Sequence, residues 1–307
     1  MKTPSMWRRA LRRKSVWISL LVMLGLGTVA ILAPWLAPHD PYRWSLEGGQ
    51  SNLPAAWVDN PYKPGMAEFP LGTDAYGRDV LSRLIYGTRT AFFLILTAIP
   101  LAALIGALLG LTAGYLGGRV DAGITLVSDT LQSLPGIMFA VIIILIFRSY
   151  LAPTWLNGLI ALSVGFAAVS WVSLARMVRV STLTLKAQLF VEAAIALGAS
   201  RWEVIIRHLL PNVLHLILVW IINQAPAVIL LEAILGYIGV GVTGAVDGGE
   251  FTVVSWGGMF YAGRSAMSRN PLMLIVPSLC ILLMSVSFIL LANFLNESTR
   301  KEIDFAG

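Results

Sequence analysis

The sequence has few charged residues and few of the side chains that usually carry chemistry. Only 12% of its 307 residues are charged, whereas soluble domains have about 25%. It contains one cysteine, Cys280, so no disulfide can form within the chain. None of its lysines follows a glycine, so it has no phosphate-binding P-loop and cannot hydrolyse ATP by that route.

The sequence also lacks the motifs of metal sites and of proteases. The three histidines, His39, His208 and His215, form no HExxH pair. There is no nucleophile elbow, and Asp129 has no second aspartate within an apolar run to pair with. We therefore expect no metal, no cofactor and no enzymatic activity in this chain.

What the sequence has instead is apolar residues in long runs. Hydrophobic residues make up 57% of the chain, against 45–50% in a usual soluble domain. About 20 apolar residues are enough for a helix to cross the hydrocarbon core of a bilayer. The sequence therefore predicts an all-α integral membrane protein with six transmembrane helices, at residues 16–36, 91–115, 124–147, 155–178, 213–235 and 272–294.

Basic residues lie beside these runs and predict the orientation. The net charge is +6, but the basic residues are not interleaved with aromatic residues on one polar module, so we expect membrane lipid and no nucleic acid as a partner. Five basic residues lie between positions 8 and 14, just before the first run, and this run is too long for a cleaved signal peptide. Residues 179–207 also carry a positive excess. Both termini and residues 179–207 are therefore predicted to be cytoplasmic.

The connecting segments divide the chain further. Residues 1–36 are expected to hold the cytoplasmic N-terminus and the first span, residues 37–89 an extracytoplasmic segment, and residues 296–307 a cytoplasmic tail. Before the second span, Asp74 is expected to cap a short interfacial helix. Its apolar strip would hold Val80, Leu81, Leu84 and Ile85, and its polar side Arg78, Asp79, Ser82 and Arg83. Residues 247–270 are expected to form a polar outer loop.

Several spans contain residues that are unusual in lipid. Glycines recur every four residues in the second span, at Gly106, Gly110 and Gly114, and are typical of close helix packing. Polar side chains in the fifth span, at Asn223, Gln224 and Glu232, are expected to face protein or water. They are candidates for a translocation path, and contacts between helices are the alternative.

The segment at residues 191–213 is more polar than its surroundings. At helical spacing, one face would collect Val191, Ile195, Gly198, Trp202, Ile205 and Leu209. A glycine at position 198 weakens a helix and Pro211 removes a backbone donor, so we expect two short helices followed by a stop. Such a segment either docks on a partner or lies on the membrane surface.

The same segment resembles the cytoplasmic loop motif of ABC importer permeases. The residues that match are Glu192-Ala193-Ala194, Gly198 and Leu210-Pro211. Further matches are residues 71–87, residues 114–118 leading to Asp121, Asp129 with Leu134-Pro135, and residues 235–241 followed by Trp256-Gly257. Together they resemble the second of the paired permeases in the dipeptide/oligopeptide/nickel permease family, over residues 71–294. Residues 44–68 and 292–297 depart from that pattern.

The resemblance implies a type I ABC importer permease with a cytoplasmic coupling helix, and a transmembrane domain at residues 90–295. It assigns ATPase coupling to Glu192, Ala193, Ala194, Gly198, Trp202, Leu210 and Pro211. It also implies uptake of di- or oligopeptides or related small solutes across a bacterial inner membrane, with a homologous permease as heterodimer partner, two ABC ATPase subunits and an extracytoplasmic solute-binding protein. The alternative is a non-transporting membrane scaffold with an amphipathic anchor, but the acidic residues Glu192 and Glu203 argue against an anchor for anionic lipid.

Overall fold

The computed structural model describes residues 13–42, 50–58, 63–150, 155–241, 253–267 and 270–306. Within these ranges the chain forms helices, connecting segments and one isolated β-bridge, between Thr73 and Asp79. In chain order the helices are α2 (Lys14–Leu36), α3 (Val80–Leu116), α4 (Gly118–Ser133), α5 (Gly136–Tyr150), α6 (Trp155–Lys186), α7 (Leu189–Ala196), α8 (Arg201–Glu203), the π-helix η2 (Val204–Leu209), α9 (Leu210–Tyr237), α10 (Trp256–Ala266) and α11 (Leu272–Ala306).

Five helical stretches are long and apolar enough to cross a membrane. They are α2, α3, most of α6, the continuous stretch Arg201–Tyr237, and α11 as far as Glu297. The α4–α5 pair makes a sixth if it counts as one span. The expected all-α membrane architecture is therefore confirmed, with five unbroken candidate spans and one bent helix pair.

The break between α4 and α5 corrects the third expected span, which is not one straight helix. The two helices meet at 99°. Leu134, at the junction, has the extended angles φ −88° and ψ 141°. Pro135 explains this geometry, because its ring disfavours the helical conformation of the residue before it. A proline inside an apolar run thus divides the span into two arms.

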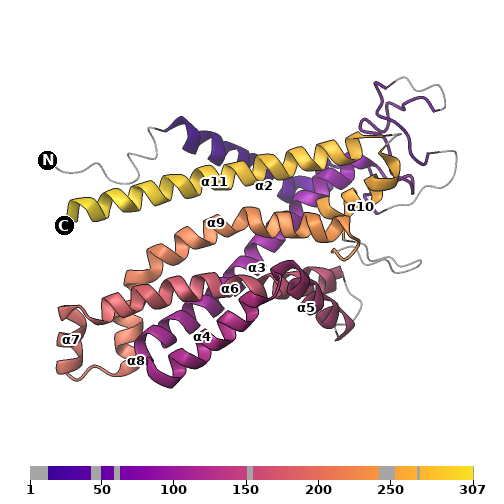
Figure 1. Cartoon of the computed structure of the whole chain (residues 1–307). Helices are drawn as coiled ribbons and strands as arrows, with labels where there is room; N and C mark the ends of the chain where they lie inside the picture. The colour runs from indigo at the N-terminus through magenta and orange to yellow at the C-terminus, as the bar shows by residue number, and fades with distance from the viewer. Residues whose placement is uncertain are drawn as a thin grey trace.

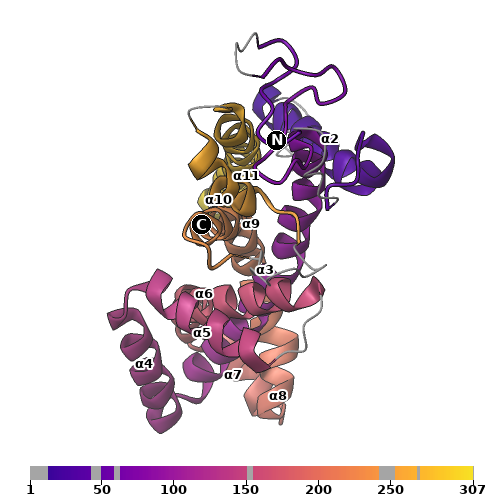
Figure 2. The same ribbon diagram turned by 90° about the vertical axis from the view of Figure 1, so that its right-hand side faces the viewer.

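The helices form an elongated bundle with two distinct ends (Figure 1). The start of α2, the end of α11, α7 and α8 lie at one end, which we call the α7 end, and α10 lies at the opposite end. An ion pair of 2.6 Å between Arg13 and Glu297 joins the start of α2 to α11. Seen along the bundle, α2, α9, α10 and α11 gather on one side of α3 and α4–α8 on the other (Figure 2).

Glycines bring α3 and α6 into direct backbone contact, as their spacing predicted. A Cβ on Gly106 would lie 2.7 Å from the carbonyl oxygen of Trp171, and one on Gly110 would lie 2.6 Å from that of Ala175. At Gly114 the nearest atom is the Cβ of Thr182, at 2.7 Å. The α3–α6 contact therefore depends on the absence of side chains along one face of α3.

The beginning of α3 differs from the expected interfacial helix. The N-cap is Asp79, whose carboxylate accepts hydrogen bonds from the backbone N–H groups of Leu81 and Ser82. The helix then continues without a break to Leu116, so the expected short helix and the second span are one element. The side expected to be polar and solvated is buried, with Ser82 and Arg83 almost fully enclosed.

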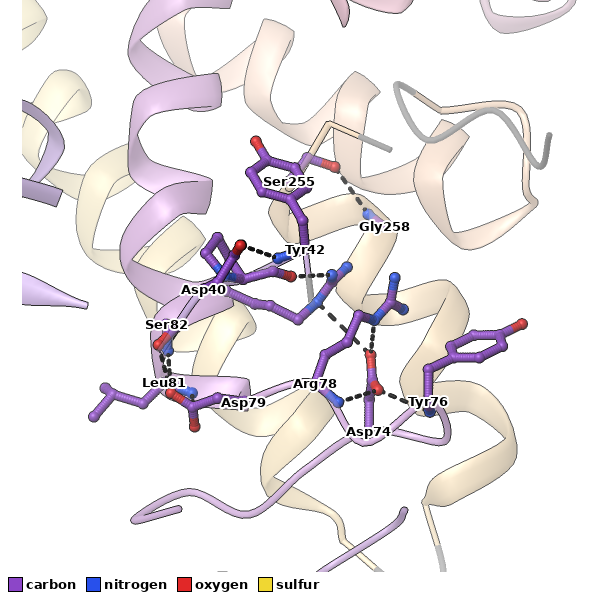
Figure 3. Close-up of polar contacts among 12 residues, drawn as sticks. Asp40, Tyr42, Asp74, Tyr76, Arg78, Asp79, Leu81, Ser82, Ser255 and Gly258 are labelled. Atoms are coloured by element: carbon purple, nitrogen blue, oxygen red, sulfur yellow. Dashed lines mark hydrogen bonds and ion pairs between the residues drawn. The ribbon is translucent and has the colours of Figure 1, made fainter. Parts of the chain in front are cut away.

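Asp74, expected to be a cap, is instead the centre of a buried polar cluster (Figure 3). Its carboxylate accepts hydrogen bonds from the backbone N–H groups of Tyr76 and Arg78 and, at 2.7 Å, from Nε of Arg78. Arg83 lies 3.8 Å from the same carboxylate and donates to the carbonyl oxygen of Pro41. These bonds compensate the buried charges and hold the preceding segment against the start of α3.

The region after α9 is more ordered than the loop expected at residues 247–270. The glycine-rich end of α9 does break the helix, since α9 ends at Tyr237. Residues 242–252 lie outside the described part of the chain, but α10 then forms a helix of 11 residues. Ser255 caps it by accepting a hydrogen bond from the N–H of Gly258. The expected loop therefore contains a helix that packs against α3, α9 and α11.

Candidate functional site

The candidate site is residues 189–209, which we call the coupling segment. It begins with α7, which ends in a left-handed turn at Gly198, where φ is +90°. The N–H of Gly198 bonds to the carbonyl of Ile195, and the N–H of Ala199 bonds to that of Ala194. This is the pattern of a Schellman motif, which favours glycine because a Cβ strains a backbone with positive φ. Gly198 therefore reverses the chain rather than merely loosening a helix.

A second helical stretch starts directly after this turn. The hydroxyl of Ser200 accepts the N–H of Glu203, which caps α8. The spacing Ser-x-x-Glu is the sequence signature of a capping box, and this signal predicts a helix start at Arg201. Arg207 pairs with Glu203 at 2.5 Å, one turn further on.

The expected stop at Pro211 is wrong. Helix α9 begins at Leu210, so Pro211 lies in its first turn, and Arg201–Tyr237 forms one continuous helical stretch. Within this stretch Pro211 removes one backbone hydrogen bond without ending the helix. The chain widens to a π-helix at Val204–Leu209 just before this point. Such π stretches are frequent at functional sites.

The six apolar residues expected on one face are divided between two environments. Val191, Ile205 and Leu209 are buried in the main core of the molecule. Ile195 and Trp202 are exposed, Trp202 by 65%. The turn at Gly198 interrupts the helical period, so residues on its two sides do not continue one stripe.

The exposed side of the coupling segment is strongly apolar. Leu197, at the tip of the turn, is 89% exposed, and Leu189 is 82% exposed. Phe190, Ile195, Trp202 and Ile206 add to this surface. Leu189, Leu197 and Ile206 are absent from the residues expected from sequence, because they lie off the predicted stripe. For Leu197 the available signal was its position next to Gly198, and the sequence offered none for the other two.

The residues assigned to ATPase coupling differ in exposure. Five of them, Glu192, Ala193, Gly198, Trp202 and Pro211, are exposed, and two, Ala194 and Leu210, are half-buried. A Cβ on Gly198 would meet nothing within 4 Å in this chain. The surface around Gly198 is therefore open to a partner.

Ion pairs brace the helices that carry the coupling segment. Arg176 on α6 pairs with Asp129 on α4 at 2.6 Å. Arg179, one turn further along α6, pairs with Asp121 near the start of α4. At the end of α6, Lys186 donates to the carbonyl oxygen of Tyr115 on α3 at 2.7 Å. These contacts join α3, α4 and α6 immediately before α7, so a force on α7 reaches three helices.

The three path candidates lie on α9 in different environments. Asn223 is exposed, and its amide donates to the carbonyl oxygen of Val219 in the same helix. Gln224 is half-buried. Glu232 is only 4% exposed, and its carboxylate accepts the N–H of Gly257 at 3.1 Å. Glu232 therefore joins α9 to α10, whereas Asn223 faces outward.

No set of three or more His, Cys, Asp or Glu side chains comes together as a metal site would require, as far as the described residues show. The absence of a metal or cofactor stays a prediction.

Sequence comparisons connect this geometry to known proteins. The family model described as "Binding-protein-dependent transport system inner membrane component" matches residues 106–301, which include the coupling segment. A second model, described as "N-terminal TM domain of oligopeptide transport permease C", matches residues 4–56.

Individual relatives match along almost the whole chain. The oligopeptide transport system permease protein OppC of Haemophilus influenzae is 31% identical, over 98% of this chain and 88% of its own. The dipeptide transport system permease protein DppC of Bacillus subtilis is 30% identical, over 96% and 84%. The glutathione transport system permease protein GsiD of Pectobacterium atrosepticum is 31% identical, over 97% and 89%.

These similarities agree with the apolar spans and with the exposed coupling segment. The matched family consists of transport permeases, so the chain is a transport subunit and not itself an enzyme. With a match that covers more than half of its length, the chain belongs to the family of inner membrane components of binding-protein-dependent transport systems.

Proposed function

We propose that this chain is one of two permeases in an ATP-driven importer of peptides. In this proposal a homologous permease forms the other half of the path, one of two ABC ATPase subunits binds the coupling segment, and a solute-binding protein delivers the cargo. Peptides are the cargo because relatives at about 30% identity are described as oligopeptide and dipeptide permeases.

The observation that carries the proposal is the two-sided character of the coupling segment. Val191, Val204 and Leu209 anchor it in the core, while Leu197 and Trp202 project from the molecule. Large exposed apolar side chains on a rigid support are typical of the anchors of a protein interface. Because the chain has no P-loop, the partner bound there has to supply the energy of ATP hydrolysis.

The orientation follows from charge and from the arrangement of the bundle. Basic residues precede α2, and basic residues face the cytoplasm in membrane proteins. The Arg13–Glu297 pair and Figure 1 bring the start of α2 and the end of α11 to the α7 end. We infer that the α7 end is cytoplasmic, together with both termini, and that the α10 end faces outward.

One face of α9 supports the pairing with a second permease. At about 3.6 residues per turn, it carries Asn223 together with Leu230 and Ile234, and all three are exposed. An amide among exposed apolar residues in a membrane is expected to face a partner helix or a water-filled path. Asn223 and Gln224 therefore remain the better path candidates, and Glu232 the weaker one.

Cysteine cross-linking tests the coupling proposal directly, because Cys280 is the one native cysteine to replace. In a Cys280→Ser background, Leu197→Cys should form a cross-link to an ATPase subunit carrying cysteines in its permease-facing groove. Trp57→Cys, which is 66% exposed but far along the chain in the outer segment, is the matched control and should form none. Equal cross-linking of both variants, or of neither when ATPases co-purify, would contradict the proposal.

Uptake of labelled peptides by proteoliposomes that contain the whole transporter tests the transport function. The scaffold alternative predicts no ATP-dependent uptake and purification without an ATPase. The family match fits the permease and does not fit the scaffold. Uptake that requires ATP inside reconstituted vesicles, the solute-binding protein and this chain is the expected result.

A further inference from the structure

An exposed arginine at the α10 end is held between two tyrosine rings. The guanidinium carbon of Arg264 on α10 lies 5.1 Å from the ring centroid of Tyr261 and 5.7 Å from that of Tyr237. Tyr261 precedes Arg264 by one helical turn, and Tyr237 is the last residue of α9. Each tyrosine is 47% exposed, so the cluster is open to solvent.

The backbone around this cluster is held firmly in place. Thr90 on α3 donates to the carbonyl oxygen of Val254 at 2.6 Å, just before α10. The indole of Trp256 donates to the carbonyl oxygen of Leu84 at 3.1 Å. On the other side, a Cβ on Gly236 of α9 would lie 2.2 Å from the carbonyl carbon of Gly257. Helix α10 is thus fixed to α3 and α9 before Arg264 is reached.

The turn after α9 also shapes the cluster. Gly239 has φ +85°, and a Cβ there would lie 3.0 Å from Cε2 of Tyr261. The Tyr261 ring therefore packs against this turn while its other side meets Arg264. The two tyrosines restrict the rotamers of Arg264, which lowers the entropy cost of using it for binding.

The positive charge of Arg264 can bind an anionic ligand. No ion pair to Arg264 occurs among the described residues, in contrast to Arg176, Arg179 and Arg207. Stacking on aromatic rings uses the faces of the guanidinium and leaves its edge, with its N–H donors, free for bidentate bonding. A carboxylate matches that edge in shape and charge.

We propose that Arg264, Tyr237 and Tyr261 form a site for the C-terminal carboxylate of an arriving peptide. This inference rests on the proposed function, and it concerns the first contact of the cargo with the permease. Tyr237 continues the exposed face of α9 that carries Asn223, so a peptide bound at the cluster lies at the entrance of the proposed path. The hydroxyl groups of the tyrosines supply further hydrogen-bonding partners.

The experiment uses the complete transporter, with both permeases, the ATPases and the solute-binding protein, in proteoliposomes. Uptake of a tetrapeptide and of its C-terminal amide is measured at concentrations that saturate the solute-binding protein, as determined on that protein alone. The ATPase rate stimulated by the peptide-free solute-binding protein is measured in parallel. Variants are Arg264→Gln, which removes the charge, and Arg264→Lys, which keeps it without the planar fork.

We expect Arg264→Gln to reduce uptake of the free acid about 10-fold, the order of a lost charge-assisted bond. Uptake of the amide, and ATPase stimulation by the peptide-free binding protein, should stay at the wild-type level. Arg264→Lys should fall between. Arg89→Gln is the matched control, because Arg89 is also exposed and stacks on one ring, that of Tyr86, at 5.7 Å.

Two results would overturn the site. If Arg264→Gln lowers uptake of both peptides and the ATPase stimulation together, Arg264 binds an acidic group of the solute-binding protein instead. If it changes none of them, the cluster has no role in uptake. A wild-type transporter that takes up no peptide at all refutes the proposed function itself, which separates the two failures.

Discussion

The indole ring of Trp256 fills the space beside Gly87, so that a Cβ on Gly87 would lie 2.5 Å from Cδ1 of the ring. Trp256 is almost fully buried by this contact and by its hydrogen bond to Leu84. One glycine near the start of α3 thus allows α10 to pack on the bundle.

Substitution of Gly87 should therefore loosen α10. We expect Gly87→Ala to lower the free energy of unfolding by about 1–3 kcal/mol, the usual cost of overpacking a filled site. Denaturant unfolding of the purified protein in detergent measures this. Gly123→Ala on α4 is the control, since a Cβ there meets nothing within 4 Å. Equal stability of the two variants would show that Trp256 can move aside.

Gly110 tests the α3–α6 contact. A valine there would place its Cβ 2.6 Å from the carbonyl oxygen of Ala175 and 2.8 Å from the Cβ of Val178. Because two helix backbones would have to separate, we expect Gly110→Val to reduce the amount of folded protein in the membrane several-fold, as measured by size-exclusion chromatography after extraction. Gly25→Val on α2, where a Cβ has no neighbour within 4 Å, should accumulate normally. A monodisperse Gly110→Val protein at normal levels would contradict this packing.

Two substitutions of Gly198 show why glycine is needed there. The reason is either the backbone conformation of the turn or the close approach of an ATPase subunit. Its φ of +90° makes any Cβ unfavourable, at a cost of about 1–2 kcal/mol, while asparagine tolerates positive φ better than alanine does. If the turn itself matters, Gly198→Asn should retain more ATP-dependent uptake than the smaller Gly198→Ala. If close contact with the ATPase matters more, the order reverses. Uptake per ATP hydrolysed is the quantity to compare, with accumulation in the membrane as the control.

Two substitutions of Glu232 show whether this residue lines the translocation path or positions α10. Gln at this position keeps a carbonyl oxygen to accept the N–H of Gly257, whereas leucine leaves that N–H buried without a partner, at a cost of about 1–3 kcal/mol. For a positioning role, Glu232→Gln should retain uptake and stability, and Glu232→Leu should lose both. Loss of uptake in Glu232→Gln at normal stability would instead indicate direct contact with the cargo.

Sequence reasoning predicted the spans because long apolar runs have few alternatives. It was less successful at residues whose type fits more than one local structure. Pro211 was expected to end a helix and instead lies in a first turn, whereas Pro135, expected inside a span, divides it. Asp74 and Asp79 both suit an N-cap by local pattern. The choice depends on Arg83, whose position is set by the packing of the whole bundle.

The coupling segment shows the same limit. The motif around Glu192 located the segment, but its apolar residues were assigned to one face by counting along an unbroken helix. The turn at Gly198 ends that periodicity, so Val191 before the turn is buried and Trp202 after it is exposed. The cluster around Arg264 could not be predicted, because it joins residues from two helices across a connection whose path the sequence does not specify.

The uninterrupted stretch from Arg201 to Tyr237 has a mechanical consequence. Its 37 residues make a rod about 55 Å long, with Trp202 near one tip and Tyr237 at the other. A tilt of about 5° around its middle would move each tip by roughly 2–3 Å, in opposite directions. In the proposed transporter, a movement that an ATPase imposes on the Trp202 tip would therefore be carried along the rod to Tyr237 and to α10, which is fixed to the end of α9 at Gly236.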